Sequence, residues 1–246
     1  MEWWEDIYNR DIYFRLYETE DIESVAEETE GIIKLLKPQP QAKILDLCCG
    51  YGRHSIELAK KGFKVVGVDI SEKQIQHAIK RAKESNIDVV FQIKDARKLD
   101  FNEEFDFVIN MFLSFGYFEN QEEDKDVLKS VFKALKPGGK FLMDFWNAEK
   151  AIRDLKPIVT EKIKDISIVK EWKFDAANKR LNWKNIVIFP DGRKESWNHS
   201  IKAYMVAEIK NLMEEVGLKF EKVYGSLKGE EYTINSPAAV IMAIKN

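Results

Sequence analysis

The sequence contains little cysteine, few histidines and no long apolar run. Its 246 residues include two cysteines, three histidines and six prolines. The two cysteines, Cys48 and Cys49, are adjacent, so they cannot form an ordinary disulfide with each other or supply a cysteine zinc site. No stretch reaches the roughly 20 apolar residues that span a bilayer, and the acidic, aromatic start MEWWEDIYNR is unlike a signal peptide. We therefore expect a cytoplasmic protein without a membrane partner.

Charge is nearly balanced over the chain. The formal net charge is -3 and the isoelectric point is about 5.8, which gives no overall attraction to nucleic acid or to anionic membranes. The hydrophobic content of 45% is ample for a buried core at this length. These values favour a globular protein that acts on small or neutral partners.

Short apolar runs alternate with amphipathic helices along much of the chain. The patterns predict helices over 55–61, 72–84 and 207–216, and a Pro-Gly-Gly turn at 137–139 that precedes a strand. Alternating strands and helices imply a parallel sheet, so the fold class is α/β. The predicted strands include 43–48, 64–69, 89–94, 105–110 and a final strand at 238–244.

Two segments depart from this alternation. Residues 1–41 have helical patterning with many aromatic side chains, and Pro38 and Pro40 end it. From about residue 162 to 204 the sequence is strand-like in three stretches, with a hairpin signal at Asp191-Gly192. We expect one domain over 1–246, in which 1–41 form a helical lid and 158–205 form an antiparallel insertion for substrate covering or oligomer contact.

A glycine-containing turn follows the first predicted strand, within KILDLCCGYGRHS. Gly50 and Gly52 would let the backbone approach a ligand, and Asp69, at the end of the second strand, could accept hydrogen bonds from ribose hydroxyls. A dinucleotide-binding fingerprint would have a third glycine where Ser55 stands, and Asp46 inside the first strand is also unusual for that class. Both departures argue against NAD.

The ordered set of motifs resembles the class I S-adenosylmethionine-dependent methyltransferases. The motifs are LDLCCGYGRHS, VDI, KDA, FDFVIN and LKPGGK, and the resemblance covers roughly residues 25–147, with the last helix and strands matching more loosely. It implies a Rossmann-like, doubly wound, mostly parallel seven-stranded sheet with helices on both faces. The implied cofactor is S-adenosyl-L-methionine, with S-adenosyl-L-homocysteine as product. No metal ligand is implied, and the catalytic residues remain unknown.

The same resemblance assigns cofactor contacts to strand ends. Asp46 would lie near the methionine moiety, Asp69 would accept from both ribose hydroxyls, and Asp95 would accept from the adenine amino group. Ile70 would pack on adenine and the Ala96 amide would donate to a ring nitrogen. Asn110 would contact the cofactor through its carbonyl, Tyr17 would lie against the cofactor carboxylate, and the turn would pass beneath the methionine and ribose. The full set is Tyr17, Asp46, Cys48, Cys49, Gly50, Gly52, Asp69, Ile70, Asp95, Ala96 and Asn110.

Several of these positions also have a purely structural interpretation. Asp69 could cap the following helix, Asp95 could be an ordinary turn residue, and His54 could only orient the glycine turn. His199 is the only imidazole of the inserted region and could titrate near neutrality as a base. His77 is expected on the solvated side of a helix.

The resemblance implies in-line methyl transfer, and the acceptor has to be judged from other features. The stretch NMFLSFGYF after the fourth strand lacks the Asn/Asp-Pro-Pro-aromatic motif of nucleobase amino-methyltransferases. We therefore expect a small-molecule acceptor, with nucleic acid disfavoured. An RNA or protein methyltransferase is the first alternative, and an NAD-dependent oxidoreductase is an alternative from a different class. Assembly into a homo-oligomer is left open.

Overall fold

The computed structural model describes residues 3–17 and 22–246, and its centre is a seven-stranded sheet. The strand order is β10-β11-β5-β4-β1-β2-β3, in which β1 to β5 run parallel and β11 is antiparallel to both neighbours. This confirms the predicted fold class. The strands are β1 (Lys43–Leu47), β2 (Lys64–Asp69), β3 (Val90–Ile93), β4 (Phe105–Asn110), β5 (Leu135–Trp146), β10 (Leu218–Tyr224) and β11 (Ala238–Lys245).

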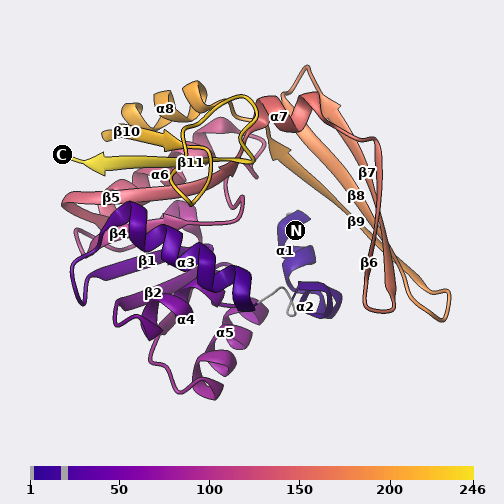
Figure 1. Cartoon of the computed structure of the whole chain (residues 1–246), viewed down its shortest axis with the longest axis horizontal. Coiled ribbons are helices and arrows are strands. Elements are labelled where there is room, and N and C mark those ends of the chain that lie inside the picture. The colour runs from indigo at the N-terminus through magenta and orange to yellow at the C-terminus, as the bar shows by residue number, and fades with distance from the viewer. Residues whose placement is uncertain (1–2, 18–21) are drawn as a thin grey trace.

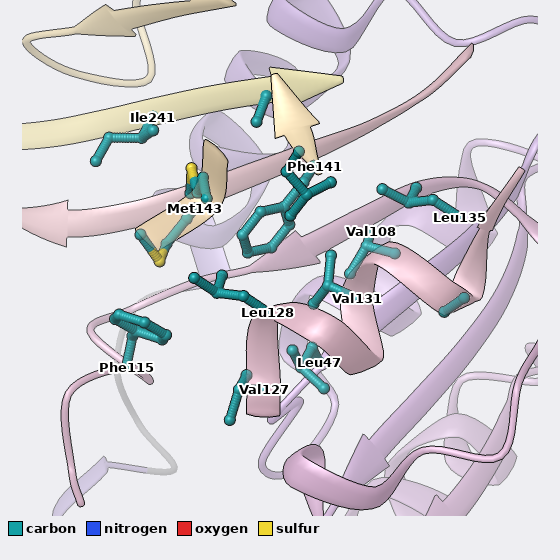
Figure 2. Packing of buried hydrophobic residues seen from close by; sticks show 14 of the residues in the cluster. Leu47, Val108, Phe115, Val127, Leu128, Val131, Leu135, Phe141, Met143 and Ile241 are labelled. Carbon is teal, nitrogen blue, oxygen red and sulfur yellow. The ribbon is translucent and has the colours of Figure 1, made fainter. Parts of the chain in front are cut away.

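Helices cover both faces of this sheet, because successive strand residues point to opposite sides. Ile44 packs with α3 and α4 on one face, and Leu45 packs with α6 and α8 on the other. Figure 2 shows the second face, where Leu128 and Val131 of α6 point toward Phe141. In the described residues, no helix is long and apolar enough to cross a membrane. The helices are α3 (Ile22–Leu36), α4 (Arg53–Lys60), α5 (Glu72–Glu84), the 3-10 helix η1 (Ala96–Lys98), α6 (Gln121–Ala134) and α8 (Val206–Glu215).

The predicted Pro-Gly-Gly turn at 137–139 lies within β5. Phe105 pairs with Leu135 and Phe107 pairs with Lys140, so one residue of β4 faces four of β5 at this point. The turn is therefore an irregularity inside a strand that begins earlier than the pattern predicted.

A second, smaller sheet interrupts the α/β order, as the sequence predicted. It is antiparallel, with strand order β6-β7-β8-β9, and the Asp191-Gly192 signal lies in its last hairpin. It has one strand more than the three stretches that the pattern indicated, because the edge strand β6 is mostly exposed and carries a weak apolar signal. Its strands are β6 (Ile158–Ile163), β7 (Ile166–Asp175), β8 (Arg180–Ile188) and β9 (Lys194–Lys202).

Two N-terminal helices, α1 (Trp3–Tyr8) and α2 (Asp11–Tyr17), lie between the two sheets (Figure 1). Their apolar side chains pack on the small sheet, where Ile7 and Leu16 join the cluster that contains Val187. On the opposite side, Phe14 stacks on the imidazole of His77 in α5, with ring centroids 3.9 Å apart. His77 is therefore half-buried, because the N-terminal segment covers part of a side chain that was expected to be solvated.

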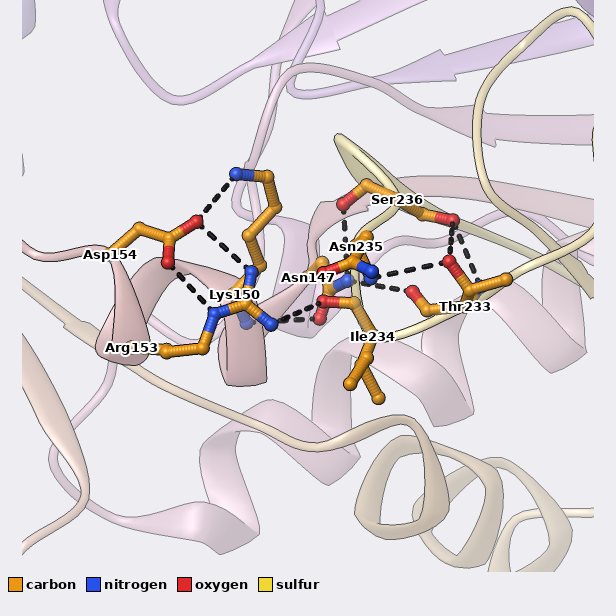
Figure 3. Close-up of polar contacts among 8 residues, drawn as sticks. All are labelled: Asn147, Lys150, Arg153, Asp154, Thr233, Ile234, Asn235 and Ser236. Atoms are coloured by element: carbon orange, nitrogen blue, oxygen red, sulfur yellow. Dashed lines mark hydrogen bonds and ion pairs between the residues drawn. The ribbon is translucent and has the colours of Figure 1, made fainter.

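The helix that leads into the small sheet, α7 (Ala148–Arg153), is fastened to the loop before β11 (Figure 3). Asn147 caps α7 through the Lys150 amide and donates from Nδ2 to the carbonyls of Thr233 and Ser236 at 3.0 and 3.1 Å. Arg153 donates to the Ile234 carbonyl at 3.4 Å. These contacts fix where the chain leaves the central sheet.

Candidate functional site

A cavity of about 230 Å³ opens at the carboxyl ends of the parallel strands, which is where ligands bind in open α/β sheets. One part of its wall comes from the turns after β1, β2 and β3, and the other part comes from α1, the segment after β4, and the small sheet. Eight of the predicted site residues line it: Asp46, Cys48, Cys49, Gly50, Asp69, Ile70, Asp95 and Ala96.

The carboxylate of Asp69 joins two of the cavity's turns. Its Oδ2 accepts from the Gly50 amide at 2.9 Å and its Oδ1 accepts from the Ser71 amide at 2.8 Å. Burial raises the pKa of Asp69 to about 6, although both amides favour the ionised form. The cap of α5 is Ser71, whose hydroxyl accepts from the Gln74 amide, so Asp69 is not the side chain that caps this helix.

Asp46 and His54 lie on either side of the glycine turn in the sequence. Asp46 is buried and accepts a 2.6 Å hydrogen bond from the Ser55 hydroxyl, while burial raises its pKa. His54, also buried, lies 2.7 Å from Glu28 Oε2 through its Nε2. Asp46 therefore connects β1 to α4, and His54 connects α4 to α3.

The two cysteines lie in the turn after β1 rather than inside the strand. Cys48 has a positive φ of 57°, a conformation that non-glycine residues rarely adopt, and the Cys49 amide donates to the Val68 carbonyl at 2.9 Å. Both thiols are free, and burial raises their pKa values. They are therefore poor nucleophiles, and their contribution to the cavity is the shape of the backbone.

Asp95 caps η1 and is held by Arg97. Its Oδ1 accepts from the Arg97 amide at 2.9 Å, and the Arg97 guanidinium donates to both of its oxygens. Burial opposes the charge, but the hydrogen bonds from Arg97 outweigh it and hold the pKa of Asp95 below its ordinary value. The carboxylate is therefore ionised and fixed at the end of β3.

Three predicted residues lie outside the cavity wall or outside what the structure describes. Gly52 has a φ of 76°, and a Cβ at this position would come within 2.7 Å of the Phe91 ring, so packing explains the glycine. Asn110 donates from Nδ2 to the Leu47 carbonyl at 3.1 Å, and its buried Oδ1 has no hydrogen-bond partner in the described residues. The Tyr17 side chain lies outside the described part of the chain.

Aromatic side chains form the other part of the wall. The Tyr8 and Tyr117 hydroxyls are 2.8 Å apart, and burial raises the pKa of Tyr117. Trp4 packs edge to face on Phe118 at 5.2 Å between ring centroids. The sequence predicted helix packing for the N-terminal aromatics, and only the fold shows that Trp4 and Tyr8 reach the cavity.

His199 lines the cavity within an aromatic stack. The centroid of its ring lies 4.3 Å from that of Trp183. Its Nε2 accepts from the Trp197 indole N–H at 2.9 Å and lies 3.1 Å from Asn185 Nδ2. Burial, with a contribution from Lys170, lowers the pKa of His199 to about 3. The expectation that His199 titrates near neutrality is therefore wrong, and an imidazole whose Nε2 lone pair accepts a hydrogen bond is not available there as a base.

Comparisons with known proteins agree with this geometry. The family described as "Methyltransferase domain" matches residues 44–139. The cypemycin N-terminal methyltransferase of a Streptomyces species is 27% identical over 210 residues, which cover 84% of each chain.

Two solved structures share the fold. An S-adenosylmethionine-dependent methyltransferase from Clostridium acetobutylicum superposes with a TM-score of 0.80 at 18% identity, covering 95% of this chain and 96% of that chain. The S-adenosylmethionine-bound amino pentose methyltransferase CalS10 of Micromonospora echinaspora has a TM-score of 0.70 at 18% identity, with 96% and 98% covered. The matched family shows that residues 44–139 form a methyltransferase domain, and the two solved structures show that the whole chain has the fold of S-adenosylmethionine-dependent methyltransferases. Together they support S-adenosylmethionine as the cofactor.

Proposed function

We propose that this enzyme methylates the nitrogen of a small-molecule amine. The observation that carries the proposal is the division of one cavity into a polar part, with Asp69 and Asp95, and an aromatic part, with Tyr8, Tyr117 and Trp183. The polar part suits a nucleoside, whose hydroxyls and amino group need acceptors. The aromatic part suits a small organic molecule, since such pockets are mostly apolar with a few polar groups.

The cofactor would extend along the strand ends from β3 to β1. Asp95 and Ala96 would hold adenine, Asp69 would hold the ribose, and the turn around Gly50 would hold the methionine moiety. An ionised carboxylate has about four acceptor positions, so Asp69 can accept from two hydroxyls while it keeps its two amide donors. S-Adenosylmethionine supplies a methyl group that is already activated on a sulfonium. The protein therefore has to align the acceptor and exclude water.

The aromatic part would hold the acceptor amine in its neutral form. An amine accepts a methyl group only through a free lone pair, and enclosure by apolar rings such as Phe118 and Trp183 lowers an amine pKa. The hydroxyls of Tyr8 and Tyr117 could accept hydrogen bonds from its N–H groups. Because His199 is not available as a base, desolvation takes the place of a general base in this proposal.

The relatives' names support nitrogen as the methylated atom. The cypemycin enzyme is named for an N-terminal position, and CalS10 is described as an amino pentose methyltransferase. The segment 1–41 and the insertion 158–205 would act as a lid, because α1 and the small sheet both contribute to the aromatic wall through Tyr8 and Trp183.

The test uses purified protein with methyl-labelled S-adenosylmethionine. The acceptors are a panel of small primary and secondary amines, including amino sugars, each paired with the analogue that has a hydroxyl in place of the amine. Total tRNA and an unfolded protein complete the panel. We expect label only in amines. Label in a hydroxyl analogue, in RNA or in protein, with none in any small amine, would overturn the proposal.

A further inference from the structure

We infer that Arg53 binds the carboxylate of the cofactor's methionine moiety, an assignment that rests on the orientation of the cofactor proposed above. Arg53 is the first residue of α4 and follows the glycine turn directly. It lines the cavity, yet only 10% of its side chain is exposed. A guanidinium with so little contact with water needs acceptors from the protein or from a ligand.

The protein supplies too few acceptors for this guanidinium. Its Nη2 is buried and has no hydrogen-bond partner among the described residues. The carboxylate oxygen Oε2 of Glu28 lies 3.5 Å away, within ion-pair range, but that oxygen already contacts His54 Nε2 at 2.7 Å. The Arg53 Cζ lies 4.5 Å from the centroid of the Phe112 ring, which supports the guanidinium from one side. The residue is therefore held in place with a donor to spare.

The other two basic residues of the cavity wall differ in this respect. Lys94 donates to Asp100 at 2.6 Å, and Arg97 donates to Asp95 and Glu123, each at 2.6 Å. Among the side chains that the structure describes, these two and Arg53 are the Lys and Arg side chains that line the cavity. Arg53 alone of the three has a buried N–H group without an acceptor.

The sheet order places Arg53 at the correct end for this role. Along the sheet, β3 is followed by β2, β1 and β4, so Asp95 and Asp69 precede the β1 turn. Adenine at Asp95 and ribose at Asp69 direct the methionine moiety toward the turns after β1 and β4, where Arg53 and Phe112 lie. A guanidinium matches a carboxylate with two parallel N–H donors.

The test compares two cofactors that differ only in this carboxylate, S-adenosylmethionine and decarboxylated S-adenosylmethionine. Calorimetry measures both affinities for the full-length protein, for R53Q, for R53K and for R97Q as a control at the adenine end. For the unsubstituted protein we expect S-adenosylmethionine to bind about tenfold more tightly or better, as a charged hydrogen bond implies. The ratio of the two cofactor affinities should fall close to one in R53Q and should stay unchanged in R97Q.

R53K separates charge from geometry, because an ammonium lacks the planar fork of a guanidinium. We expect it to reduce the ratio several-fold without abolishing it. If R53Q shows no cooperative thermal transition, R53K alone decides the question. A ratio that stays at the unsubstituted value in the folded variant would overturn the inference. Because no acceptor is present in this assay, its result is independent of whether the substrate is an amine.

Discussion

The amide of Gly50 donates to Asp69 Oδ2 across 2.9 Å, and this bond connects the turn after β1 to the end of β2. The two elements that would hold the cofactor's ribose and methionine are thus positioned by one carboxylate. Because that carboxylate is buried, with a pKa raised to about 6, its charge state changes within an accessible pH range.

Cofactor affinity should therefore depend on pH through Asp69. The ionised form accepts hydrogen bonds, so S-adenosylhomocysteine affinity should be constant above about pH 7 and fall below pH 6 as the carboxyl is protonated. D69N should bind about 1–3 kcal/mol more weakly at pH 8, because the amide retains only one acceptor oxygen, and should lose this pH dependence. Calorimetry from pH 5 to 8 measures both. A flat profile for the unsubstituted protein would contradict the assignment.

The same carboxylate should lower the stability of the cofactor-free protein at neutral pH. A folded-state pKa of about 6 against 3.8 means that the folded state binds the proton more tightly between these values. The contribution of Asp69 to the free energy of unfolding therefore falls as pH rises from about 4 to 6, by up to about 3 kcal/mol. Urea unfolding measures the free energy of unfolding of D69N and of the unsubstituted protein. As pH rises over this interval, D69N should become more stable relative to the unsubstituted protein. A constant difference would exclude the linkage.

Gly52 and Gly62 form a matched pair that separates the cost of backbone strain from the cost of disturbed packing in a Gly→Ala substitution. Both have positive φ, but a Cβ at Gly52 would come within 2.7 Å of the Phe91 ring, whereas at Gly62 it would meet nothing within 4 Å. G62A should cost about 1 kcal/mol of unfolding free energy from strain alone. G52A should cost about 1–3 kcal/mol more, because the Phe91 ring must move. Equal costs in urea unfolding would show that the ring yields freely.

The His199 imidazole should remain neutral over the working pH range. With a pKa lowered to about 3 by burial, its ring NMR signals should not shift between pH 5 and 8. H199Q identifies these signals by their loss. A titration midpoint above pH 5.5 would restore His199 as a candidate base, and would also require that the Trp197 indole lose its acceptor.

Trp183 should affect the acceptor without affecting the cofactor. It lines the aromatic part of the cavity, whereas its stacking neighbour Trp172, 4.6 Å away between ring centroids, does not. W183A should lower kcat/KM for the acceptor by about 10-fold to 100-fold, which matches the 1.5–3 kcal/mol of one large buried side chain. S-Adenosylhomocysteine affinity should stay within about threefold. W172A is the control and should have the smaller effect. Equal losses of cofactor affinity and activity in W183A would place Trp183 on the cofactor side.

Local patterns in the sequence were sufficient for the α/β order and the cofactor end of the cavity. Continuous apolar runs predict buried parallel strands. Because the turns after parallel strands lie at one edge of the sheet, Gly50, Asp69 and Asp95 come together there however the other segments fold. The same motifs supported S-adenosylmethionine over NAD, and the matched methyltransferase domain agrees. The antiparallel insertion was also visible, because its alternation and hairpin signal are local.

Tertiary structure alone decided what surrounds that edge. The contact of Tyr8 with Tyr117, 109 positions apart, arises from how α1 packs against the segment after β4, which no local pattern encodes. Burial also decided ionisation: the pKa of His199 fell and that of Asp69 rose because each is removed from water by distant segments. The sequence by itself determined the order in which strands and motifs follow one another along the chain, and the type of cofactor. The acceptor side needed the fold, because it is built from side chains that meet only after the chain has packed.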